Sequence, residues 1–444
     1  MRFRGRRLAT LSTGDLLGLL LTLVLVLPLL RYLFFSGTVR DTSEILPNSA
    51  VDQPTEDFFK SYWQRPIPLQ GAAPASFTEK EASLKPEACG SCHRQQYTDW
   101  KKSLHSKTMG VGPWGQIVDL EKRSPDQAAL CMTCHAPLSE QMPAVEAVSG
   151  QGQKGYAKNP QFDGPLQLHG ITCAACHVRQ HRRFGPPKTE GAATAAYPSN
   201  MPNHGGVKRT PYFEKAEFCR DCHQFDPENT PLVNGKPMQD TYREWQASAW
   251  GRGGAACQEC HMPDRRHLWK GIHDPEMVKN SVRVEAHITQ RTSTSRGTLE
   301  LAVEVTNSAV GHKFPSYITP KIFVRMALLD GAGGSLPGTQ QEKIIGWDVR
   351  FEDAEWKEYF DTRIAPGESL RHRFRWTELP AAKKVRVWIE VHPDHFYRVH
   401  FYPAYLKDEK LSPEGRKLVE RALRHSGRTP YTLFDEMLPL DSPK

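Results

Sequence analysis

Long apolar runs are scarce in this sequence of 444 residues, whose mean hydropathy is -0.56 with 39% hydrophobic residues. A protein that crosses a membrane many times needs about 20 apolar residues for each crossing, so that class is excluded. Disorder is excluded as well, because 19 Phe, 13 Tyr and 10 Trp are far more aromatic side chains than a non-folding chain carries. The length fits roughly two to three domains.

Isolated cysteines are also lacking. The 10 cysteines form five pairs with two residues between the members, and a histidine follows each pair at once. We number these segments in chain order as segments 1 to 5: residues 89–93, 131–135, 173–177, 219–223 and 257–261. Their cysteines are Cys89, Cys92, Cys131, Cys134, Cys173, Cys176, Cys219, Cys222, Cys257 and Cys260, and their histidines are His93, His135, His177, His223 and His261.

This spacing favours covalent haem over other cysteine chemistry. The two sulfurs can bond the two vinyl groups at one edge of a porphyrin, while the next imidazole ligates the iron. A structural zinc site would need two such pairs per metal and gives the histidine no role. Redox-active pairs would need a βαβ pattern nearby, which is lacking, and disulfides do not need the histidine. The sequence therefore predicts five covalently bound haem c groups with the five segment histidines as proximal ligands.

One uncharged run stands near the start of the chain. Residues 16–30 carry no charge, and the run extends to residue 35 with Arg31 as its one charged member. About 20 such residues just span a bilayer. The preceding arginines, Arg2, Arg4, Arg6 and Arg7, predict a cytoplasmic N-terminus with Arg31 at the outer face.

A cleaved signal peptide is the alternative for this run, but residues 34–37 lack a small-x-small cleavage site. We therefore expect residues 1–39 to be a basic stub and a single-pass anchor in the inner membrane, with the rest of the chain periplasmic.

The next part of the chain predicts a tether and then a haem domain. Residues 40–84 hold several prolines and little periodicity, which predicts an extended tether with at most one short helix near residues 58–63. Residues 85–278 are rich in glycine and proline, so their helices should be short. In residues 89–109, four side chains recur at helical spacing and predict one helix: His93, Tyr97, Trp100 and Leu104.

After about residue 280 apolar and polar residues alternate strictly, which is typical of half-buried strands. Six or more strands predict a small antiparallel β-sandwich over residues 279–405. Ser412-Pro413 predicts the start of a helix, so residues 406–444 should form a C-terminal helix and tail. The predicted fold class is α+β: one transmembrane helix, a mostly helical or irregular haem domain, and the β-sandwich.

The distal ligands are a separate question, since 13 of the 18 histidines lie outside the five segments. A haem with two histidine ligands is saturated and suits electron transfer, whereas an open sixth position permits catalysis. His105 lies 12 residues past His93, which is about 18 Å along a continuous helix, so it suits a neighbouring haem and not its own. The candidate distal ligands are His105, His169, His204, His273 with His267 nearby, and His312. A surface or hydrogen-bonded histidine is the alternative for each.

Cys89-Gly-Ser-Cys-His93, with Tyr97, Trp100, Ser103 and His105 after it, resembles the first haem segment of the cytochrome c-554 family. Further similarity lies in residues 170–177 and 218–223, and the resemblance covers roughly residues 86–262. It implies a helical stack of haems, electron transfer in the periplasm, and a distal-ligand role for His105 at another haem. In the type member one haem has an open sixth site. Segment 5 and the appended β-domain, with Gly-His-Lys-Phe-Pro at residues 311–315, depart from the family pattern.

Two functions therefore compete. The leading hypothesis is a membrane-anchored periplasmic pentahaem cytochrome, with no catalytic residues, that carries electrons between quinol-linked or soluble cytochrome partners. The alternative is a reductase or oxidase of a small nitrogen or sulfur species at a five-coordinate haem, although no segment is the C-x-x-C-K variant of nitrite and octahaem reductases. A third hypothesis makes the β-domain a docking module for a partner protein.

The net charge of +8 does not point to nucleic acid. Residues 1–35 hold five Arg and one Asp, a sum of +4, which leaves +4 for the exported part. Five reduced haems would add about ten negative charges through their propionates, so the exported part comes to about -6. We therefore expect no nucleic-acid partner, and a redox partner with a basic docking face.

Overall fold

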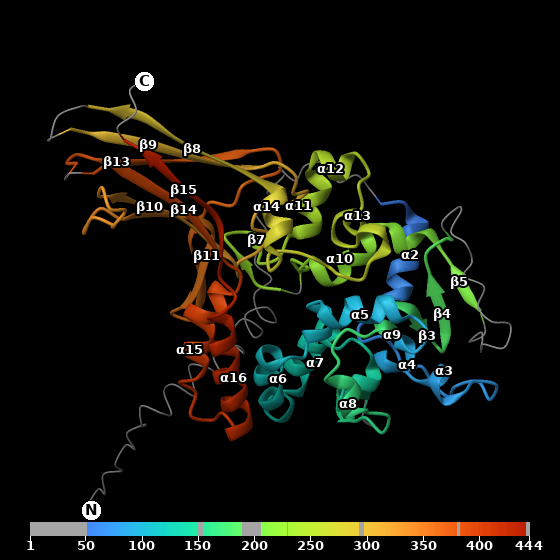
Figure 1. Ribbon diagram of the computed structural model, residues 1–444. Helices are drawn as coiled ribbons and strands as arrows, with labels where there is room; N and C mark the ends of the chain where they lie inside the picture. The colour runs from blue at the N-terminus through green and yellow to red at the C-terminus, as the bar shows by residue number, and fades with distance from the viewer. Residues whose placement is uncertain are drawn as a thin grey trace, which may run out of the picture.

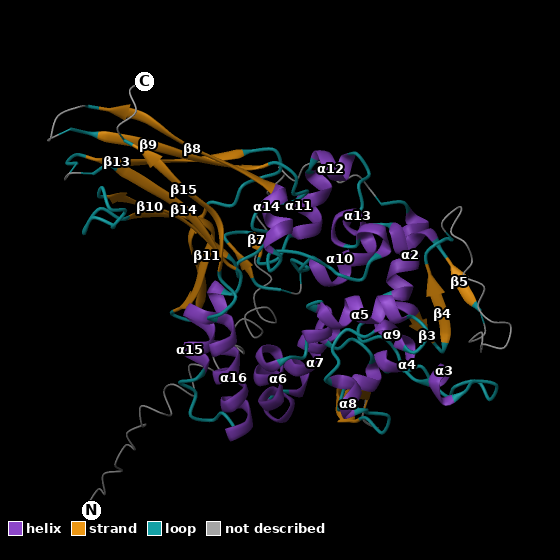
Figure 2. Cartoon of the chain, in the orientation of Figure 1, coloured by secondary structure: helices purple, strands orange, loops and turns teal. Residues whose placement is uncertain are grey.

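The computed structural model describes residues 51–148, 154–188, 206–228, 230–292, 297–379 and 382–440. The predicted anchor, residues 1–39, and the candidate ligand His204 lie outside these ranges. Within them, no helix combines the length and the apolar character that a membrane crossing requires. Figures 1 and 2 show a part built of short helices beside a part built of long strands.

The helical part begins at α2 and ends at α14, and its helices are short, as the abundant glycine and proline predict. Its helices are α2 (Gln53–Tyr62), α3 (Glu79–Ala82), α4 (Pro86–Gly90), α5 (Arg94–Lys102), α6 (Val111–Arg123), α7 (Pro125–His135), α8 (Gly164–Gln167), α9 (Cys173–His177), α10 (Glu217–His223), α11 (Thr241–Ala247), α12 (Ala249–Arg252), α13 (Cys257–His261) and α14 (Pro275–Ser281). Its 3₁₀ turns are η1 (His105–Lys107), η2 (Ser139–Gln141), η3 (Pro211–Glu214) and η4 (Pro263–Arg265). Its short strands are β1 (Ala144–Val148), β2 (Lys154–Lys158), β3 (Val178–Arg179), β4 (Arg182–Gly185), β5 (Val207–Arg209), β6 (Leu232–Val233) and β7 (Lys236–Pro237).

The β part consists of two antiparallel sheets that share one apolar core, which confirms the predicted sandwich. One sheet has the strand order β12-β11-β10-β14-β15 and the other has the order β13-β9-β8. Inward side chains of both sheets, such as Leu301 of β9 and Ile389 of β14, have no exposed surface. The strands are β8 (Val282–Arg291), β9 (Leu299–Asn307), β10 (Lys321–Leu329), β11 (Gln341–Glu352), β12 (Glu355–Asp361), β13 (Ser369–Trp376), β14 (Lys384–His392) and β15 (Tyr431–Pro439).

The predicted end of the sandwich at residue 405 is wrong. After the π-helix η5 (Tyr397–Phe401), α15 (Tyr402–Tyr405) and α16 (Pro413–Ser426), strand β15 returns and pairs with β14 from Tyr431 opposite Val391 to Pro439 opposite Lys384. An edge strand that is only partly covered needs no strict alternation, so its sequence gave little strand signal. The predicted helix after Ser412 is confirmed as α16, where the Ser412 hydroxyl accepts a hydrogen bond from the N–H of Gly415 at 3.0 Å.

The extended tether predicted over residues 40–84 is wrong for the residues that the structure describes. Helix α2 begins after Asp52, whose carboxylate accepts from the N–H of Thr55 at 2.9 Å. Phe59 is buried, and its ring centre lies 6.2 Å from that of Phe218 on the segment 4 helix. Further along, Ile67 bridges to Leu138. The prolines do not prevent the burial of Phe59 and Ile67. Residues 51–84 therefore pack against the helical part, and we call this stretch the strap.

The long helix predicted over residues 89–109 is also wrong. Helix α5 ends at Lys102, and His105 lies in the separate turn η1. The hydroxyls of Ser103 and Ser106 donate to the backbone carbonyls of Trp100 and Ser103 at 2.8 and 2.9 Å. Such bonds from serine to nearby backbone groups compete with helix continuation.

Helix α16 lies beside α6 and so joins the C-terminal region to the helical part (Figure 1). The contact is close at Gly115, where a Cβ would lie 3.0 Å from side-chain atoms of Leu418 and Val419 and 3.1 Å from the backbone nitrogen of Val419. Glycine is therefore required for this distance between the helices.

Replacing Gly115 by Leu should push α16 away from α6, because the added atoms meet backbone as well as side chains. We expect faster cleavage after residue 405 in limited proteolysis of the holo-protein. The matched control is Gly155→Leu, since nothing lies within 4 Å of a Cβ at Gly155. Equal proteolysis of the two variants would contradict the role of Gly115.

Candidate haem centres

Each cysteine pair lies on one helical turn with its histidine. Residues i, i+3 and i+4 of a helix share one face, and this is the spacing of the two cysteines and the histidine. Helices α9 and α13 coincide with segments 3 and 5, while α7 and α10 end at His135 and His223. In segment 1 the N–H of His93 donates to the carbonyl of Cys89 at 2.8 Å and closes the same turn. All ten cysteines are free of disulfides, so each turn presents two thiols and an imidazole together.

Three of the segment histidines face a second histidine from another part of the chain. The ring centres of His105 and His223 are 6.2 Å apart, those of His177 and His267 are 6.1 Å apart, and those of His261 and His312 are 6.4 Å apart. A metal–imidazole bond is about 2 Å long and the ring centre lies about 1.2 Å beyond, so two imidazoles on opposite faces of one iron have centres about 6.3 Å apart. The three separations fit a shared iron.

The protonation of these imidazoles fits metal binding as well. Nδ1 donates to a backbone carbonyl in His177 at 2.8 Å, in His267 at 3.0 Å and in His312 at 2.9 Å, and Nδ1 of His135 does the same at 2.9 Å. Such a bond fixes the tautomer that keeps the Nε2 lone pair for a metal. Burial lowers the pKa of His177 and His312 to about 4, so both rings are neutral at pH 7.

His267 is held in place by a carboxylate of segment 1's neighbouring helix. Asp99 of α5, whose side chain is 3% exposed, accepts two hydrogen bonds from the Arg266 guanidinium at 2.6 and 2.7 Å. The same carboxylate accepts from the backbone N–H of His267 at 3.2 Å. A guanidinium and a carboxylate can form two parallel hydrogen bonds. This contact therefore fixes the position of Arg266, the residue before His267, whose ring faces His177.

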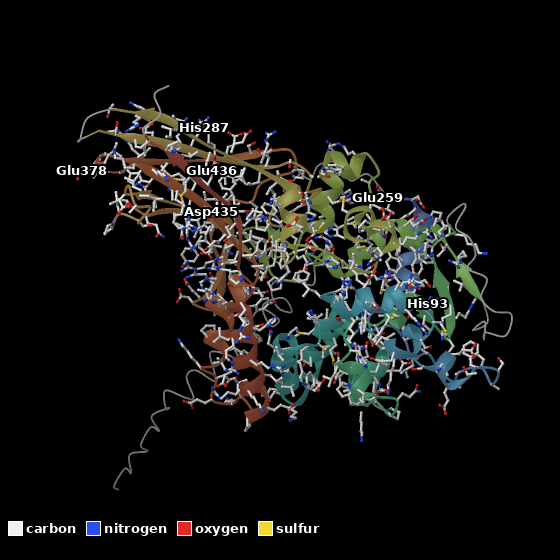
Figure 3. The ribbon with its side chains drawn as sticks, in the orientation of Figure 1. His93, Glu259, His287, Glu378, Asp435 and Glu436 are labelled. Carbon is white, nitrogen blue, oxygen red and sulfur yellow. The ribbon has the colours of Figure 1, made fainter. Side chains whose placement is uncertain are left out.

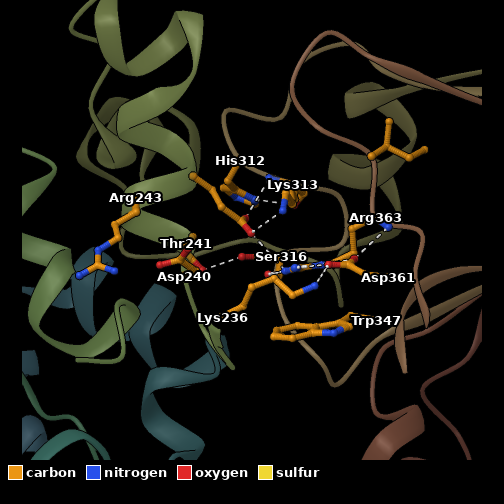
Figure 4. A network of polar contacts seen from close by, with 12 residues as sticks. Lys236, Asp240, Thr241, Arg243, His312, Lys313, Ser316, Trp347, Asp361 and Arg363 are labelled. Atoms are coloured by element: carbon orange, nitrogen blue, oxygen red, sulfur yellow. Dashed lines mark hydrogen bonds and ion pairs between the residues drawn. The ribbon is translucent and has the colours of Figure 1, made fainter. Parts of the chain in front are cut away.

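His312 is held by a polar network between α11 and the β part (Figure 4). Its carbonyl accepts from the Asn307 side chain at 2.9 Å, and the N–H of the next residue, Lys313, donates to the Glu244 carboxylate at 3.1 Å. Arg363 donates to the other oxygen of Glu244 at 3.1 Å. The Glu244 and Arg363 side chains are 7% and 2% exposed. The network extends through Asp361 and Lys236, and both Lys236 and Arg363 lie over the Trp347 ring.

The remaining candidate ligands lie elsewhere. Nε2 of His169 is 3.5 Å from Glu87, and Nε2 of His273 is 3.1 Å from Asp394. Neither faces a segment histidine in the described ranges, so the structure does not support these two predictions. His267, which lies near His273 in the sequence and follows His261 by six residues, faces His177 instead. Asp264 and Arg265, between His261 and His267, have left-handed backbone conformations.

His135 of segment 2 has a different environment. Its Nδ1 donates to the carbonyl of Thr108, and no second imidazole faces it among the residues that the structure describes. The two histidines that lie outside the segments and nearest to it in sequence, His105 and His169, are engaged with His223 and Glu87.

The segments also approach one another through their thiols. The thiols of Cys89 and Cys173, of Cys134 and Cys222, and of Cys219 and Cys257 lie close enough for one to shift the pKa of the other. Segment 1 therefore adjoins segment 3, segment 2 adjoins segment 4, and segment 4 adjoins segment 5. Segments 3 and 4 are also close enough to interact electrostatically. The pKa of Cys219 in segment 4 is raised first by Cys257, then by burial, and also by Cys176 of segment 3. Figure 3 labels His93 and Glu259, which mark segments 1 and 5 in this arrangement.

Residues 88–156, which contain segments 1 and 2, match the family model described as cytochrome c554 and c-prime. These two segments are therefore similar to the haem segments of that family. Cytochrome c-554 of Nitrosomonas europaea is 26% identical over 162 residues, which cover 33% of this chain and 60% of that relative. The match thus spans less than two thirds of the relative's length.

A solved structure, the penta-heme cytochrome c552 of Thermochromatium tepidum, resembles most of this chain with a TM-score of 0.53. The match has 17% sequence identity and covers 80% of this chain and 99% of that chain. At this identity the likeness shows the fold, a helical haem region followed by antiparallel sheets.

Replacing Glu244 by Ala should destabilise the protein by about 3 kcal/mol, because removing one partner of a buried ion pair leaves the other charge uncompensated. Denaturant unfolding followed by far-UV circular dichroism measures this loss. The control is Glu285→Ala, which removes an exposed pair with Arg283 and should change the free energy of unfolding by less than about 1 kcal/mol. Equal losses in the two variants would show that the network does not stabilise the junction.

Proposed function

We propose that the chain is a membrane-anchored periplasmic cytochrome with five haem c groups that carries electrons between respiratory-chain components. The observation that carries this proposal is the set of three imidazole pairs at separations of 6.1 to 6.4 Å. A haem with an imidazole on each face has no position for a substrate and suits one-electron transfer. Haems are numbered here by their segments.

The imidazole pairs support specific distal ligands. His105 is the proposed distal ligand of haem 4, His267 that of haem 3, and His312 that of haem 5. His267 replaces His273 in this set, and His169 is left out. His204 stays a candidate distal ligand with no haem assigned to it.

The contacts between thiols support a continuous electron path. Haems 1, 3, 4 and 5 follow one another along it, and haem 2 joins at haem 4, because the cysteines of these segments influence one another's pKa. Haems 1, 2 and 5 are then the ends of a branched path. Cys92 and Cys260, in segments 1 and 5, are the exposed members of the ten cysteines, which makes segments 1 and 5 the proposed points of contact with donor and acceptor.

The sequence supports the rest of the proposal. Residues 16–35 anchor the chain in the inner membrane, and the periplasm is the compartment of the haem and β parts. The proposed partners are quinol-linked or soluble cytochromes with a basic docking face, and nucleic acid is not among them.

A second candidate function is the reduction or oxidation of a small nitrogen or sulfur species at haem 2. It is favoured by the environment of His135, which no imidazole faces in the described ranges. An iron with one open position binds such species directly.

Replacing His267 by Ala should convert one haem from low-spin to high-spin, because that iron loses its distal nitrogen. His273→Ala is the matched control, since its ring bonds to Asp394 and faces no segment histidine among the described residues. Electron paramagnetic resonance of the ferric holo-protein counts the high-spin haems. If His273→Ala gains a high-spin signal and His267→Ala does not, His273 is the distal ligand, as predicted from the sequence.

Rapid mixing tests the carrier function. The reduced holo-protein should pass all five electrons to an oxidised soluble cytochrome, and it should show no sustained turnover with nitrite or hydroxylamine. Because each haem accepts one electron, the amount of acceptor reduced per protein also counts the haems. Continuous consumption of nitrite or hydroxylamine with an added electron donor or acceptor would favour the enzyme instead.

A further inference from the structure

The six imidazoles of the three facing pairs differ in the groups that their Nδ1 atoms meet. The four rings that pair at segments 3 and 5 each place Nδ1 against a backbone carbonyl. With their carbonyls they are His177 with Phe184 at 2.8 Å, His267 with Arg265 at 3.0 Å, His312 with Lys313 at 2.9 Å, and His261 with Lys270.

The two rings that pair at segment 4 meet no such carbonyl. Nδ1 of His105 is buried and has no hydrogen-bond partner among the residues that the structure describes. Nδ1 of His223 lies 3.2 Å from the side-chain amide nitrogen of Gln239, and an amide nitrogen donates hydrogen bonds and does not accept them. Buried polar atoms without a partner are rare, and a redox role is one reason to keep them.

An indole packs on His105 where the other rings have an acceptor. The ring centres of Trp269 and His105 lie 4.5 Å apart, with an angle of 75° between the planes. The indole nitrogen is a donor only, so Trp269 cannot accept from Nδ1. The same indole lies 5.2 Å from the ring of His267, at 86°. One side chain therefore contacts the two imidazoles that face His223 and His177.

This difference bears on the reduction potentials. A hydrogen bond from Nδ1 to a carbonyl makes an imidazole a stronger electron donor to a bound metal. Stronger axial donors favour ferric over ferrous iron and so lower the reduction potential of a haem. Both axial imidazoles of haem 3 and both of haem 5 are strengthened in this way, and neither imidazole of haem 4 is.

We propose that haem 4 has the highest reduction potential of the three haems that lie between facing imidazoles. One electron passes from ferrous haem 3 or haem 5 to ferric haem 4 and comes to rest there, with no bond formed or broken. Trp269 and Gln239 are positioning residues, because they adjoin His105 and His223 where carbonyls adjoin the other rings. The inference rests on the proposed function and goes beyond it, since a carrier needs no particular order of potentials.

A redox titration of the holo-protein, followed by electron paramagnetic resonance, tests this order. His105→Ala, His267→Ala and His312→Ala should each remove one low-spin ferric signal, which identifies haems 4, 3 and 5. In the wild-type protein the haem 4 signal should be lost first on reduction. When haem 4 is half reduced, the ferrous-to-ferric ratios of haems 3 and 5 should be about tenfold lower, or about 59 mV, the effect of one or two hydrogen bonds.

Gln239→Glu gives the His223 ring the acceptor that it lacks, with little change of shape. Hydrogen bonds to a carboxylate are strong, so the ferrous-to-ferric ratio of haem 4 at a fixed potential should fall about tenfold or more. Near-infrared magnetic circular dichroism, which responds to hydrogen bonding of axial imidazoles, should change for this haem alone. The matched control is Gln341→Glu on β11, where the Gln341 amide donates to the carbonyl of Arg375 at 2.8 Å. It adds the same charge and should leave the three potentials unchanged.

Two results would overturn the inference while the carrier function stands. One is the reduction of haem 3 or haem 5 before haem 4 in the wild-type protein. The other is a haem 4 ratio that does not fall in Gln239→Glu, or that falls equally with the ratios of haems 3 and 5, which is an effect of charge alone.

A different result would reach the proposed function itself. If His105→Ala removes no low-spin signal, the pairing of His105 with His223 at haem 4 is wrong, and the inference fails with it. The ratio of haem to protein in each variant distinguishes a lost ligand from a chain that has not folded around its haems.

Discussion

The facing of imidazole rings from distant parts of the chain is the constraint on which the structure depends. In each of the three pairs, the second histidine lies outside the segment whose histidine it faces. His105 follows segment 1 and faces His223 of segment 4, while His267 follows segment 5 and faces His177 of segment 3. His312 comes from the β part and faces His261 of segment 5. Each pair therefore closes a loop of the chain. The helical part needs such closures because its apolar clusters are small beside the continuous core of the sandwich. Under the proposed function, flat apolar haems between these rings would supply the missing core.

The bracing of the rings shows why the two parts of the chain form one site. Glu244 of α11 holds the backbone next to His312, and Arg363 of the β part holds Glu244. Asp99 of α5 does the same for the residues around His267. A buried carboxylate with all its hydrogen bonds made is rigid, so a ring fixed by its neighbours keeps its distance from the opposite ring. The β part thus helps to hold His312 opposite His261.

The sequence predicted the features that depend on residues close to one another along the chain. The spacing of two cysteines and a histidine is the spacing of one helical turn, and the alternation after residue 280 is the alternation of sandwich strands. What the sequence did not reveal depends on contacts between distant residues. The strap of residues 51–84 is held by the burial of Phe59 and Ile67, which only the folded partners provide. Helix α5 ends early through serine side chains that bond to the backbone. Which of His267 and His273 faces His177 depends on the folded path of the chain after segment 5, including the left-handed residues at positions 264 and 265.

The return of β15 gives the chain an order of assembly. The sheet that carries β10 and β14 lacks its last strand until residue 439 has been made, because β15 pairs with β14 along nearly its whole length. Segment 5 obtains His312 from the loop that precedes β10, so its second face closes only when the sandwich settles around that loop. Segments 3 and 4, by contrast, receive His267 and His105 from the helical part itself. The chain can therefore bring together the histidine pairs of segments 3 and 4 while its last third is still unfolded, and the pair of His261 and His312 forms last.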